Sequence, residues 1–444
     1  MKPKLPFSAR FSRFFTNFFA KIFGGMSGKL RTKLSEGDIF KVIKNSGYFF
    51  GTSIVGLGVS FISFPLYAIL MTKEDFGIVA FFTAVGTVAT QFSILSLTNY
   101  YIVKSRSLDK AESQTLFRNI VIFNFFWNLG LTVIGMVALH LYLIIAGSEM
   151  SVFPNGLIIF TILITQSFIT FKTVQFRIEG EGRNYFFTGI SQVIGNAIFS
   201  VGLIWAFSLG ATGKLAGIAI SNFLIALFLG RSLIWGDGEK LSIASVKAGI
   251  REMLPLTLVS FLHSTAPAAD VLVLERYNDF RGLGVYNVGK QIGNFVTLAG
   301  TSLFQAFEPG FYEDAKKRSL FRSARFYLFV LMLGLLVGLY FIFSDLIITI
   351  LTAGRFHESL QYSNIFVLQA LFLPVIQALQ VPLYLAGKVK IIAGINLVGS
   401  LITFGLIFAL TAEILYTGAA LAFLISSGLQ FLMIAIAERK YGKS

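Results

Sequence analysis

The sequence has no cysteine, three histidines and only nine prolines. Without cysteine the chain can form no disulfide framework, no thiolate nucleophile and no cysteine-ligated metal site. The histidines, His140, His263 and His357, are too scattered for the spacing of an HExxH metal site. GxGxxG, Walker A and GxSxG patterns are also missing, which argues against an ATP-driven pump. We therefore expect neither a metal nor an organic cofactor.

Charged residues are scarce as well, at 13% of the 444 residues, whereas 55% are hydrophobic and the mean hydropathy is +0.75. The core of a soluble globular protein could not hide this much apolar surface. A helical membrane crossing needs roughly 20 mainly apolar residues, and such stretches recur here between short polar breaks. The 42 glycines suit closely packed membrane helices. The sequence therefore predicts an all-α polytopic membrane protein.

Twelve stretches have the required length. We predict crossings at residues 47–71, 78–103, 119–146, 152–171, 186–208, 213–232, 253–275, 284–308, 326–351, 364–387, 391–411 and 414–437. Of the Lys and Arg residues, 31 lie in one alternating set of breaks, which includes both termini, and five lie in the other set. Because positively charged loops stay cytoplasmic, both termini are predicted to be cytoplasmic. The net charge of +15 is then mainly a topology signal, with attraction to anionic headgroups as a second use and no nucleic-acid partner expected.

The crossings divide the chain into a basic cytoplasmic segment, a six-helix lobe, a cytoplasmic linker, a second six-helix lobe and a short cytoplasmic tail. These parts are residues 1–46, 47–235, 236–252, 253–437 and 438–444. Within the first part, residues 7–23 place phenylalanines on one helical side and basic residues on the other. This pattern predicts a helix lying on the cytoplasmic leaflet; the alternative is a disordered basic tail that only enforces orientation.

Two pairs of segments within the sequence resemble each other weakly, and the members of each pair are separated by nearly the same number of residues. Asp75-Phe76 matches Asp279-Phe280 at an offset of 204, and the stretches around Gly182 and Gly387 match at an offset of 205. They predict two lobes of the same orientation, related by a pseudo-two-fold axis along the membrane normal, with the substrate between them.

The repeat brings two prolines into corresponding crossings, Pro65 late in crossing 1 and Pro267 in crossing 7. Proline removes a backbone hydrogen bond and bends a helix. These prolines are therefore the predicted hinges.

Ionisable groups are costly inside a membrane, by at least ~2.5 kcal/mol on insertion scales, so each needs a partner or a function. In crossing 8 a set of polar side chains recurs at three- and four-residue spacing and continues farther along the helix. We predict substrate contacts for this set: Asn287, Lys290, Gln291, Asn294 and Gln305.

Crossing 7 contributes His263 and Asp270, which lie seven residues apart. Asp270 and Lys290 are equally distant from position 280 at the centre of the intervening turn, so we expect them at similar depth. One interpretation is a structural salt bridge. The other makes Lys290 a cation for a diphosphate or acidic sugar, released from Asp270 when substrate enters or when Asp270, the candidate for ion coupling, takes a proton. The positions in crossings 1 and 2 that correspond to this pair are Leu66 and Gly86, so the charged pair belongs to the second lobe alone.

Two basic residues after crossing 4, Arg177 and Arg183, are candidates to meet a phosphate at the cytoplasmic mouth, although topology alone would also explain them. Amides within the first lobe, such as Gln166, Asn124 and Asn196, either hydrogen-bond sugar hydroxyls or simply hold helices together.

Four stretches carry a family resemblance: LYAILMTKEDFGIVAFFTAV, EGEGRNYFFTGISQ, REMLPLTLVSFL and DFRGLGVYNVGKQI. Over about residues 40–437 the chain resembles Wzx-type polysaccharide flippases (O-antigen, capsule or exopolysaccharide) of the multidrug/oligosaccharidyl-lipid/polysaccharide (MOP) exporter superfamily. The resemblance implies a V of two six-helix lobes around a polar, often cationic cavity. It also implies movement of an undecaprenyl-diphosphate-linked oligosaccharide across a bacterial inner membrane by alternating access, alongside a polymerase and other polysaccharide-assembly proteins. Coupling to H+ or Na+ stays open, and Lys290 is the one residue expected to be a deep cation.

Three alternatives remain. A cation-coupled small-molecule exporter of the same superfamily would typically carry an embedded acid in its first lobe, but the acid here, Asp270, lies in the second. A lipid II flippase would usually have more crossings. A membrane glycan polymerase or glycosyltransferase would need a substantial external loop, whereas the longest external break, residues 352–363, offers only Arg355, His357 and Glu358.

Overall fold

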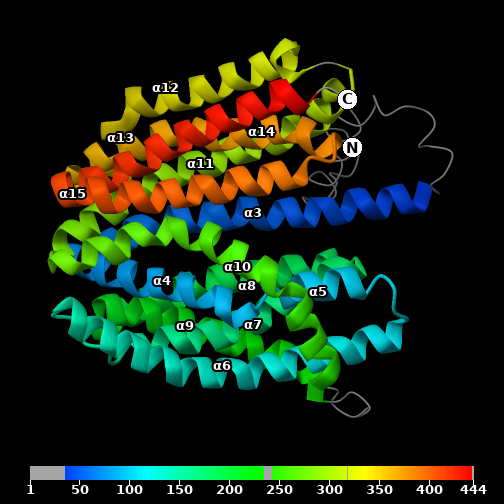
Figure 1. Ribbon diagram of the computed structural model, residues 1–444. Helices are drawn as coiled ribbons and strands as arrows, with labels where there is room; N and C mark the ends of the chain where they lie inside the picture. Colours follow the sequence, from blue (N-terminus) through cyan, green and yellow to red (C-terminus); the bar gives the residue numbers. More distant parts are fainter. Residues whose placement is uncertain (1–35, 235–242, 318, 443–444) are drawn as a thin grey trace, which may run out of the picture.

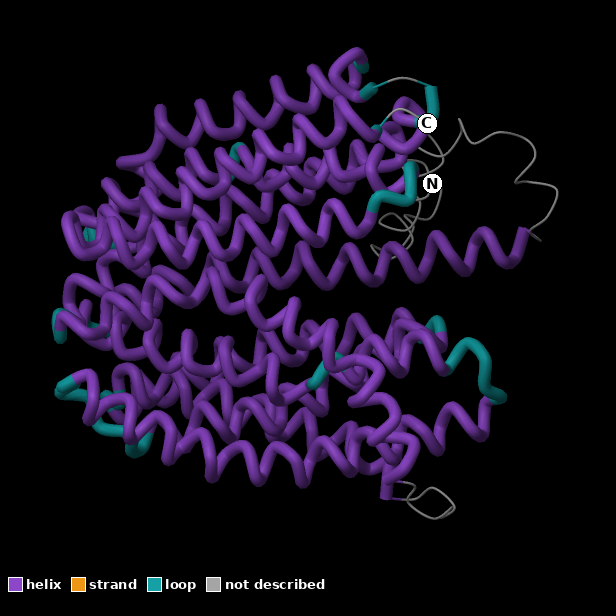
Figure 2. Tube along the Cα trace, viewed as in Figure 1, coloured by secondary structure: helices purple, strands orange, loops and turns teal. Residues whose placement is uncertain are grey.

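The computed structural model describes residues 36–234, 243–317 and 319–442, and within these ranges the elements are helices joined by short loops (Figure 2). The first bundle comprises α3 (Glu36–Leu70), α4 (Lys73–Ile94), α5 (Leu97–Lys104), α6 (Lys110–Ala146), α7 (Asn155–Glu179), α8 (Gly182–Phe207) and α9 (Gly210–Ile234). The second comprises α10 (Ile243–Leu274), η1 (Glu275–Tyr277), α11 (Phe280–Ala315), η2 (Leu320–Arg322), α12 (Ala324–Thr352), η3 (His357–Ser359), α13 (Leu360–Gln369), α14 (Phe372–Leu385) and α15 (Val389–Tyr441).

The described helices agree with the predicted number of crossings. Nine of them are long and apolar enough to span a membrane. One of the nine, α15, is two crossings, because its backbone leaves helical geometry at Ile414 and Leu415. The more polar α10 and α11 are not among the nine but have the length of crossings 7 and 8. The predicted all-α fold of twelve crossings is therefore confirmed.

Three boundaries differ from the prediction. Crossing 2 is divided into α4 and α5, because Leu95 and Ser96 adopt positive φ angles of 50° and 52°. Crossing 10 is divided into α13 and α14 at residues 370–371. The helix of crossing 1 already begins at Glu36, inside the segment assigned to the cytoplasm. The amphipathic stretch 7–23 lies outside the described residues.

The internal repeat is visible in matching turns of the two bundles. Thr72 and Asp75 form a capping box at the start of α4, and Asp75 Oδ1 also accepts the N–H of Ala211 in the first turn of α9, at 2.8 Å. In the second bundle Asp279 caps α11 through Gly282 N, and its carbonyl accepts the hydroxyl of Tyr416 at 2.8 Å. Ala211 and Tyr416 are separated by 205 residues, so the offset found in the sequence continues in three dimensions.

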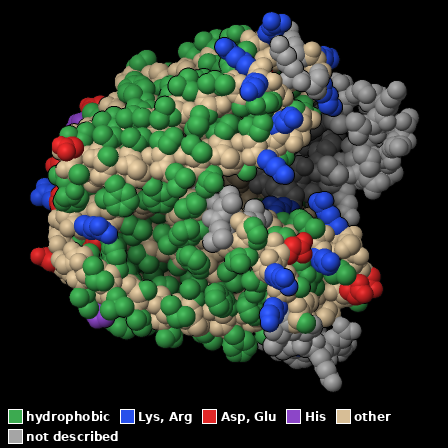
Figure 3. All heavy atoms as spheres, in the orientation of Figure 1, with side chains coloured by type: hydrophobic (Ala, Val, Ile, Leu, Met, Phe, Trp, Pro, Cys, Tyr) green, Lys and Arg blue, Asp and Glu red, His purple; other side chains and the backbone are tan. Residues whose placement is uncertain are grey.

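The bundles meet at one end of the molecule and spread apart toward the other (Figure 1). We call the meeting end, with the turns at 71–72, 147–154, 208–209, 275–279 and 353–359, the joined end. We call the other end, with the loops at 105–109, 180–181 and 386–388 and the short helix η2, the basic end. Lys and Arg side chains gather there beside a hollow between the bundles (Figure 3). Because positively charged loops stay cytoplasmic, the basic end is the one predicted to face the cytoplasm.

Two glycines allow α4 and α11 to touch at the joined end. A Cβ atom on Gly284 would lie 1.8 Å from the carbonyl oxygen of Lys73, and one on Gly77 would lie 2.1 Å from that of Phe280. Both obstacles are main-chain atoms, so no side-chain rotation could relieve the clash. These two positions therefore need glycine for the bundles to meet.

Each bundle also holds the end of the other bundle's first helix. Arg355 of the second bundle donates to the carbonyls of Ala68, at 2.7 Å, and Ile69 in α3. Tyr142 of the first bundle donates to the carbonyl of Leu272 in α10 at 2.8 Å. Ala68 and Leu272 correspond under the 204-residue offset, so the two accepting carbonyls occupy pseudo-symmetric positions, although the donors differ. We name them the paired latches.

The pseudo-symmetry fails for α10, which leaves its own bundle and slopes onto the first (Figure 1). Thr257 Oγ1 lies 3.0 Å from Ser96 Oγ, and the rings of Phe261 and Phe92 are 4.9 Å apart. In contrast, α3 packs along α8 of its own bundle. Part of α10 therefore packs against the first bundle.

Replacing Gly284 with alanine should push the bundles apart at the joined end, because the added methyl meets backbone on the opposing helix. The cysteine-free chain allows a reporter pair, Lys73→Cys with Glu358→Cys, bridged by a bifunctional maleimide. We expect the cross-linking yield to fall with Gly284→Ala and to stay unchanged with Gly334→Ala, where nothing lies within 4 Å. Equal yields in both variants would contradict this account of the glycine contact.

Candidate functional site

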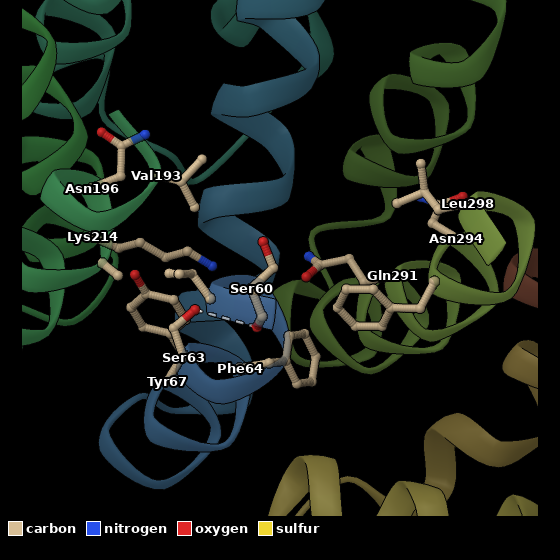
Figure 4. Close-up of a pocket in the computed structure, with 13 residues that line it drawn as sticks. Ser60, Ser63, Phe64, Tyr67, Val193, Asn196, Lys214, Gln291, Asn294 and Leu298 are labelled. Atoms are coloured by element: carbon tan, nitrogen blue, oxygen red, sulfur yellow. Dashed lines mark hydrogen bonds between the residues drawn. The ribbon is translucent and has the colours of Figure 1, made fainter. Parts of the chain in front are cut away.

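A cavity of about 360 Å³ lies between the bundles, close to the joined end. Its wall combines α3 with α8 and α9 of the first bundle and α11 of the second (Figure 4). Tyr67 and Lys214, which line it, are within a few residues of the joined-end termini of α3 and α9. The cavity therefore occupies the narrow part of the V, with the wide part toward the basic end.

Lys214 supplies the positive charge of this cavity. Its side chain reaches from the first turns of α9 toward α3 (Figure 4), and its ammonium lies 4.6 Å from the centre of the Tyr67 ring and 5.1 Å from that of Phe76. Cation–π contacts of this kind hold a cation without neutralising it. Within the described residues Lys214 Nζ makes no salt bridge. The ammonium is thus available to an anionic group that enters the cavity.

Uncharged polar groups complete the wall. They are hydroxyls on α3 and amides on α8 and α11: Ser60, Ser63, Asn196, Gln291 and Asn294. Asn196 Oδ1 is buried and has no hydrogen-bond partner in the described part of the chain. Amides and hydroxyls both donate and accept hydrogen bonds, as sugar hydroxyls do. Aromatic and aliphatic side chains, among them Phe64 and Phe295, cover the remaining wall.

The cavity corrects the expectation that Lys290 is the one deep cation. Lys214 was counted among the five basic residues of the external breaks, although it is the second residue of the predicted crossing 213–232. The helix begins earlier, at Gly210, so Lys214 lies in its second turn, within the membrane-spanning part of the chain, and faces the cavity. One sequence feature could have indicated that Lys214 lies inside the membrane: this lysine falls within the apolar stretch 213–232 and does not precede it.

Lys290 makes the ion pair that the sequence predicts. Its Nζ is 2.6 Å from Asp270 Oδ2 and 2.6 Å from the carbonyl of Pro267, and it lies 4.9 Å from the centre of the Phe423 ring. Tyr286 also donates to Asp270 Oδ2 at 2.6 Å. Asp270 is completely buried and Lys290 is 14% exposed. These contacts turn the ammonium toward α10 and α15, so Lys290 does not line the cavity although Gln291 and Asn294 do.

The other predicted residues are dispersed. Asn287 is half-buried on α11 outside the cavity wall, and Gln305 is exposed farther along the same helix. His263 is on α10, but its side chain lies outside the described residues. Arg177 and Arg183 are exposed at the basic end, on α7 and α8 respectively. The predicted hinges Pro65 and Pro267 both lie inside helices, α3 and α10, and their role stays a prediction.

Several first-bundle amides hold helices together. Asn124 donates to the carbonyl of Ser93 at 2.6 Å and accepts from Ser167 at 2.8 Å, and Asn128 donates to Asn124 Oδ1 at 2.9 Å. These groups are buried and join α4, α6 and α7. In the described ranges, moreover, no group of three or more His, Cys, Asp or Glu residues is placed to hold a metal ion.

Solved structures share this fold along most of their length. The lipid II flippase MurJ in its inward closed conformation matches with a TM-score of 0.64 and 14% identity, covering 89% of this chain and 87% of its own. An inward-facing multidrug resistance MATE family transporter of the MOP superfamily matches with a TM-score of 0.58 and 12% identity, covering 88% and 99%. The eukaryotic MATE transporter AtDTX14 matches with a TM-score of 0.56 and 14% identity, covering 90% and 95%. At these identities the likeness establishes the fold.

The family follows from the sequence comparison. No curated protein sequence matches the chain. A family model described as "Polysaccharide biosynthesis protein" does match it over residues 42–313, which is more than half of its length. The chain therefore belongs to the polysaccharide biosynthesis protein family and is a multi-pass membrane protein that shares its fold with MurJ and a MATE family transporter, as its resemblance to Wzx-type proteins implied.

Proposed function

We propose that this protein flips an undecaprenyl-diphosphate-linked oligosaccharide from the cytoplasmic to the periplasmic leaflet of a bacterial inner membrane. The observation that carries the proposal is the cavity between the bundles, which we name the interlobe cavity. It combines one cation, Lys214, with amides and hydroxyls. Lys214 suits a diphosphate, and the amides suit sugar hydroxyls. The family of the chain supports a glycan as the cargo.

The lipid tail of the substrate would stay in the bilayer during transport. Moving a long apolar chain through a polar cavity would expose it to water, and the cost would grow with every methylene. The headgroup alone would therefore enter between the bundles from the basic end and reach Lys214 near the joined end. This division agrees with the placement of Lys214 and of several hydroxyl and amide groups on the cavity wall, while the exterior of the helices is apolar.

Outward release would require the paired latches to open and the bundles to rock, with bending near Pro65 and Pro267. Coupling to H+ or Na+ would act through Asp270, the buried acid next to Lys290. The product would then be available to a polymerase and other assembly proteins on the periplasmic side.

The test is to delete the gene, extract lipid-linked oligosaccharides and determine the leaflet in which they lie. We expect a complete repeat unit to accumulate on the cytoplasmic side and to be cleared when the intact chain is restored. Accumulation of single units on the periplasmic side would instead assign the chain to polymerisation or ligation. No accumulation, together with increased drug sensitivity, would favour a small-molecule exporter.

A further inference from the structure

The ammonium of Lys214 points into the interlobe cavity although another direction is open to a lysine at this depth. Lys214 is four residues after Gly210, where α9 begins at the joined end, and four helical residues span about 6 Å. A lysine this close to the end of a membrane helix can extend its flexible stem toward water at the membrane surface. Contacts around the ammonium must therefore favour the cavity.

Two aromatic rings provide these contacts. The Tyr67 ring lies beside the Lys214 side chain (Figure 4), with its centre 4.6 Å from the ammonium, and the centre of the Phe76 ring is 5.1 Å away. Phe76 is completely buried, and its ring packs against those of Phe64, at 6.1 Å, and Phe356, at 5.0 Å. Tyr67 lines the cavity, so open space adjoins its ring on one side. The position of the Tyr67 ring therefore depends on a further contact.

Ser200 makes this contact from behind the cavity wall. It is on α8, is completely buried and is not part of the lining. Its Oγ donates to the main-chain carbonyl of Lys214 at 2.8 Å. A serine hydroxyl has one proton and two lone pairs, so the same Oγ can also accept the proton of the Tyr67 hydroxyl, with which it interacts. One hydroxyl thus connects the backbone of the lysine with the ring beside its ammonium.

Glycine–serine contacts bring α8 and α9 close enough for this arrangement. A Cβ atom on Gly217 would lie 2.3 Å from Ser200 N and 2.4 Å from Ser200 Cα. Farther along the same two helices, a Cβ atom on Gly195 would lie 2.4 Å from Ser221 Oγ. Ser221 is 1% exposed, and its hydroxyl has no hydrogen-bond partner in the described ranges. Ser221 therefore shares the packing environment of Ser200 without the bond to Lys214.

We infer that Ser200 is a positioning residue for Lys214. Its hydroxyl fixes the Tyr67 ring against the first turns of α9, and the ring holds the ammonium toward the cavity, where it meets the diphosphate. Ser200 itself touches no substrate. The inference rests on the proposed function, because it takes a diphosphate as the anion at Lys214.

The experiment measures how well inorganic pyrophosphate protects Lys214 from acetylation by a succinimidyl ester, read by peptide mass spectrometry on the full chain in detergent. This assay requires no transport. We expect Ser200→Ala to raise the half-protecting concentration of pyrophosphate about fivefold, the effect of losing one neutral hydrogen bond. Tyr67→Phe keeps the ring and removes its hydroxyl, so it should have the same effect. The double variant should lose no more than either single variant, because both remove one shared contact.

The matched control is Ser221→Ala, which should be protected as well as the unmodified chain is. Equal protection in Ser200→Ala and Ser221→Ala would overturn the inference. If Ser200→Ala fails to fold, the comparison of Tyr67→Phe with the unmodified chain decides the question. Absence of protection in the unmodified chain would instead reject the diphosphate site of the proposed function, and this inference with it.

An export assay separates positioning from a general loss of packing. Ser200→Ala should reduce export about fivefold in the unmodified chain and cause no further loss when Lys214→Met is also present, because Ser200 acts through the ammonium. A purely structural role of Ser200 would reduce export equally in both backgrounds, and that outcome would also overturn the inference.

Discussion

Lys290→Met alone should destabilise the protein by about 3–5 kcal/mol, the cost of leaving one partner of a buried ion pair without the other. The reason is the complete burial of Asp270, which cannot reach water, and its second oxygen already has no hydrogen-bond partner in the described residues. Asp270→Asn should cost less, because Lys290 is 14% exposed and keeps the Pro267 carbonyl. The double variant should recover most of the loss. Melting temperature in detergent and abundance in the membrane measure these effects.

The control for this cycle is Lys73→Met, which removes the salt bridge to Glu358 at the joined end. Glu358 is 57% exposed, and exposed pairs contribute only about 0–1 kcal/mol. Should both single variants at Asp270 and Lys290 remain stable and abundant while export stops, the structural interpretation would be wrong. The pair would then belong to substrate binding or ion coupling.

Lys214→Met should reduce export of lipid-linked oligosaccharide by about ten- to a hundredfold, the equivalent of losing a charged hydrogen bond worth roughly 1.5–3 kcal/mol. The substitution keeps an unbranched apolar stem against Tyr67 and Phe76 and removes only the charge. It breaks no salt bridge among the described residues, so abundance should be unchanged. The measurement is the initial rate of appearance of the repeat unit in the outer leaflet at matched protein level.

Lys214→Arg provides the matched comparison, since it keeps the charge and should retain most of the export. Equal export by the unmodified chain and Lys214→Met would exclude this lysine from substrate recognition. If Lys214→Arg lost as much export as Lys214→Met, the shape of the side chain at this position would be required for transport instead of its charge.

Much of the architecture could be predicted because membrane insertion imposes simple rules on the sequence. Apolar length defines a crossing, so the twelve predicted crossings have counterparts in the described helices. The turn before α4 carries a capping box of Thr72 and Asp75, a motif that involves only residues close together in the sequence and can therefore be recognised from it. The Asp270–Lys290 pair could be predicted because a short turn fixes the relative depth of two antiparallel helices.

The composition of the site was less predictable, because it depends on how separate helices pack. The positions of α10 and α15 decide whether Lys290 or Gln291 faces the cavity. The residue spacing within α11 carries no information about where those two helices lie. Lys214 was missed because it was counted with the external breaks, whereas its helix already begins at Gly210. The slope of α10 onto the first bundle breaks the repeat, so symmetry could not predict it.

The paired latches have a mechanical consequence for the kinetics of opening. The carbonyl of Ala68 is held by the second bundle and that of Leu272 by the first, and the two are related by the pseudo-two-fold axis. A rotation of the bundles about an axis in the membrane plane lengthens both contacts at once, so neither can be released early to lower the barrier for the other. The joined end should therefore open as a single cooperative event, and its rate should respond equally to weakening of either latch.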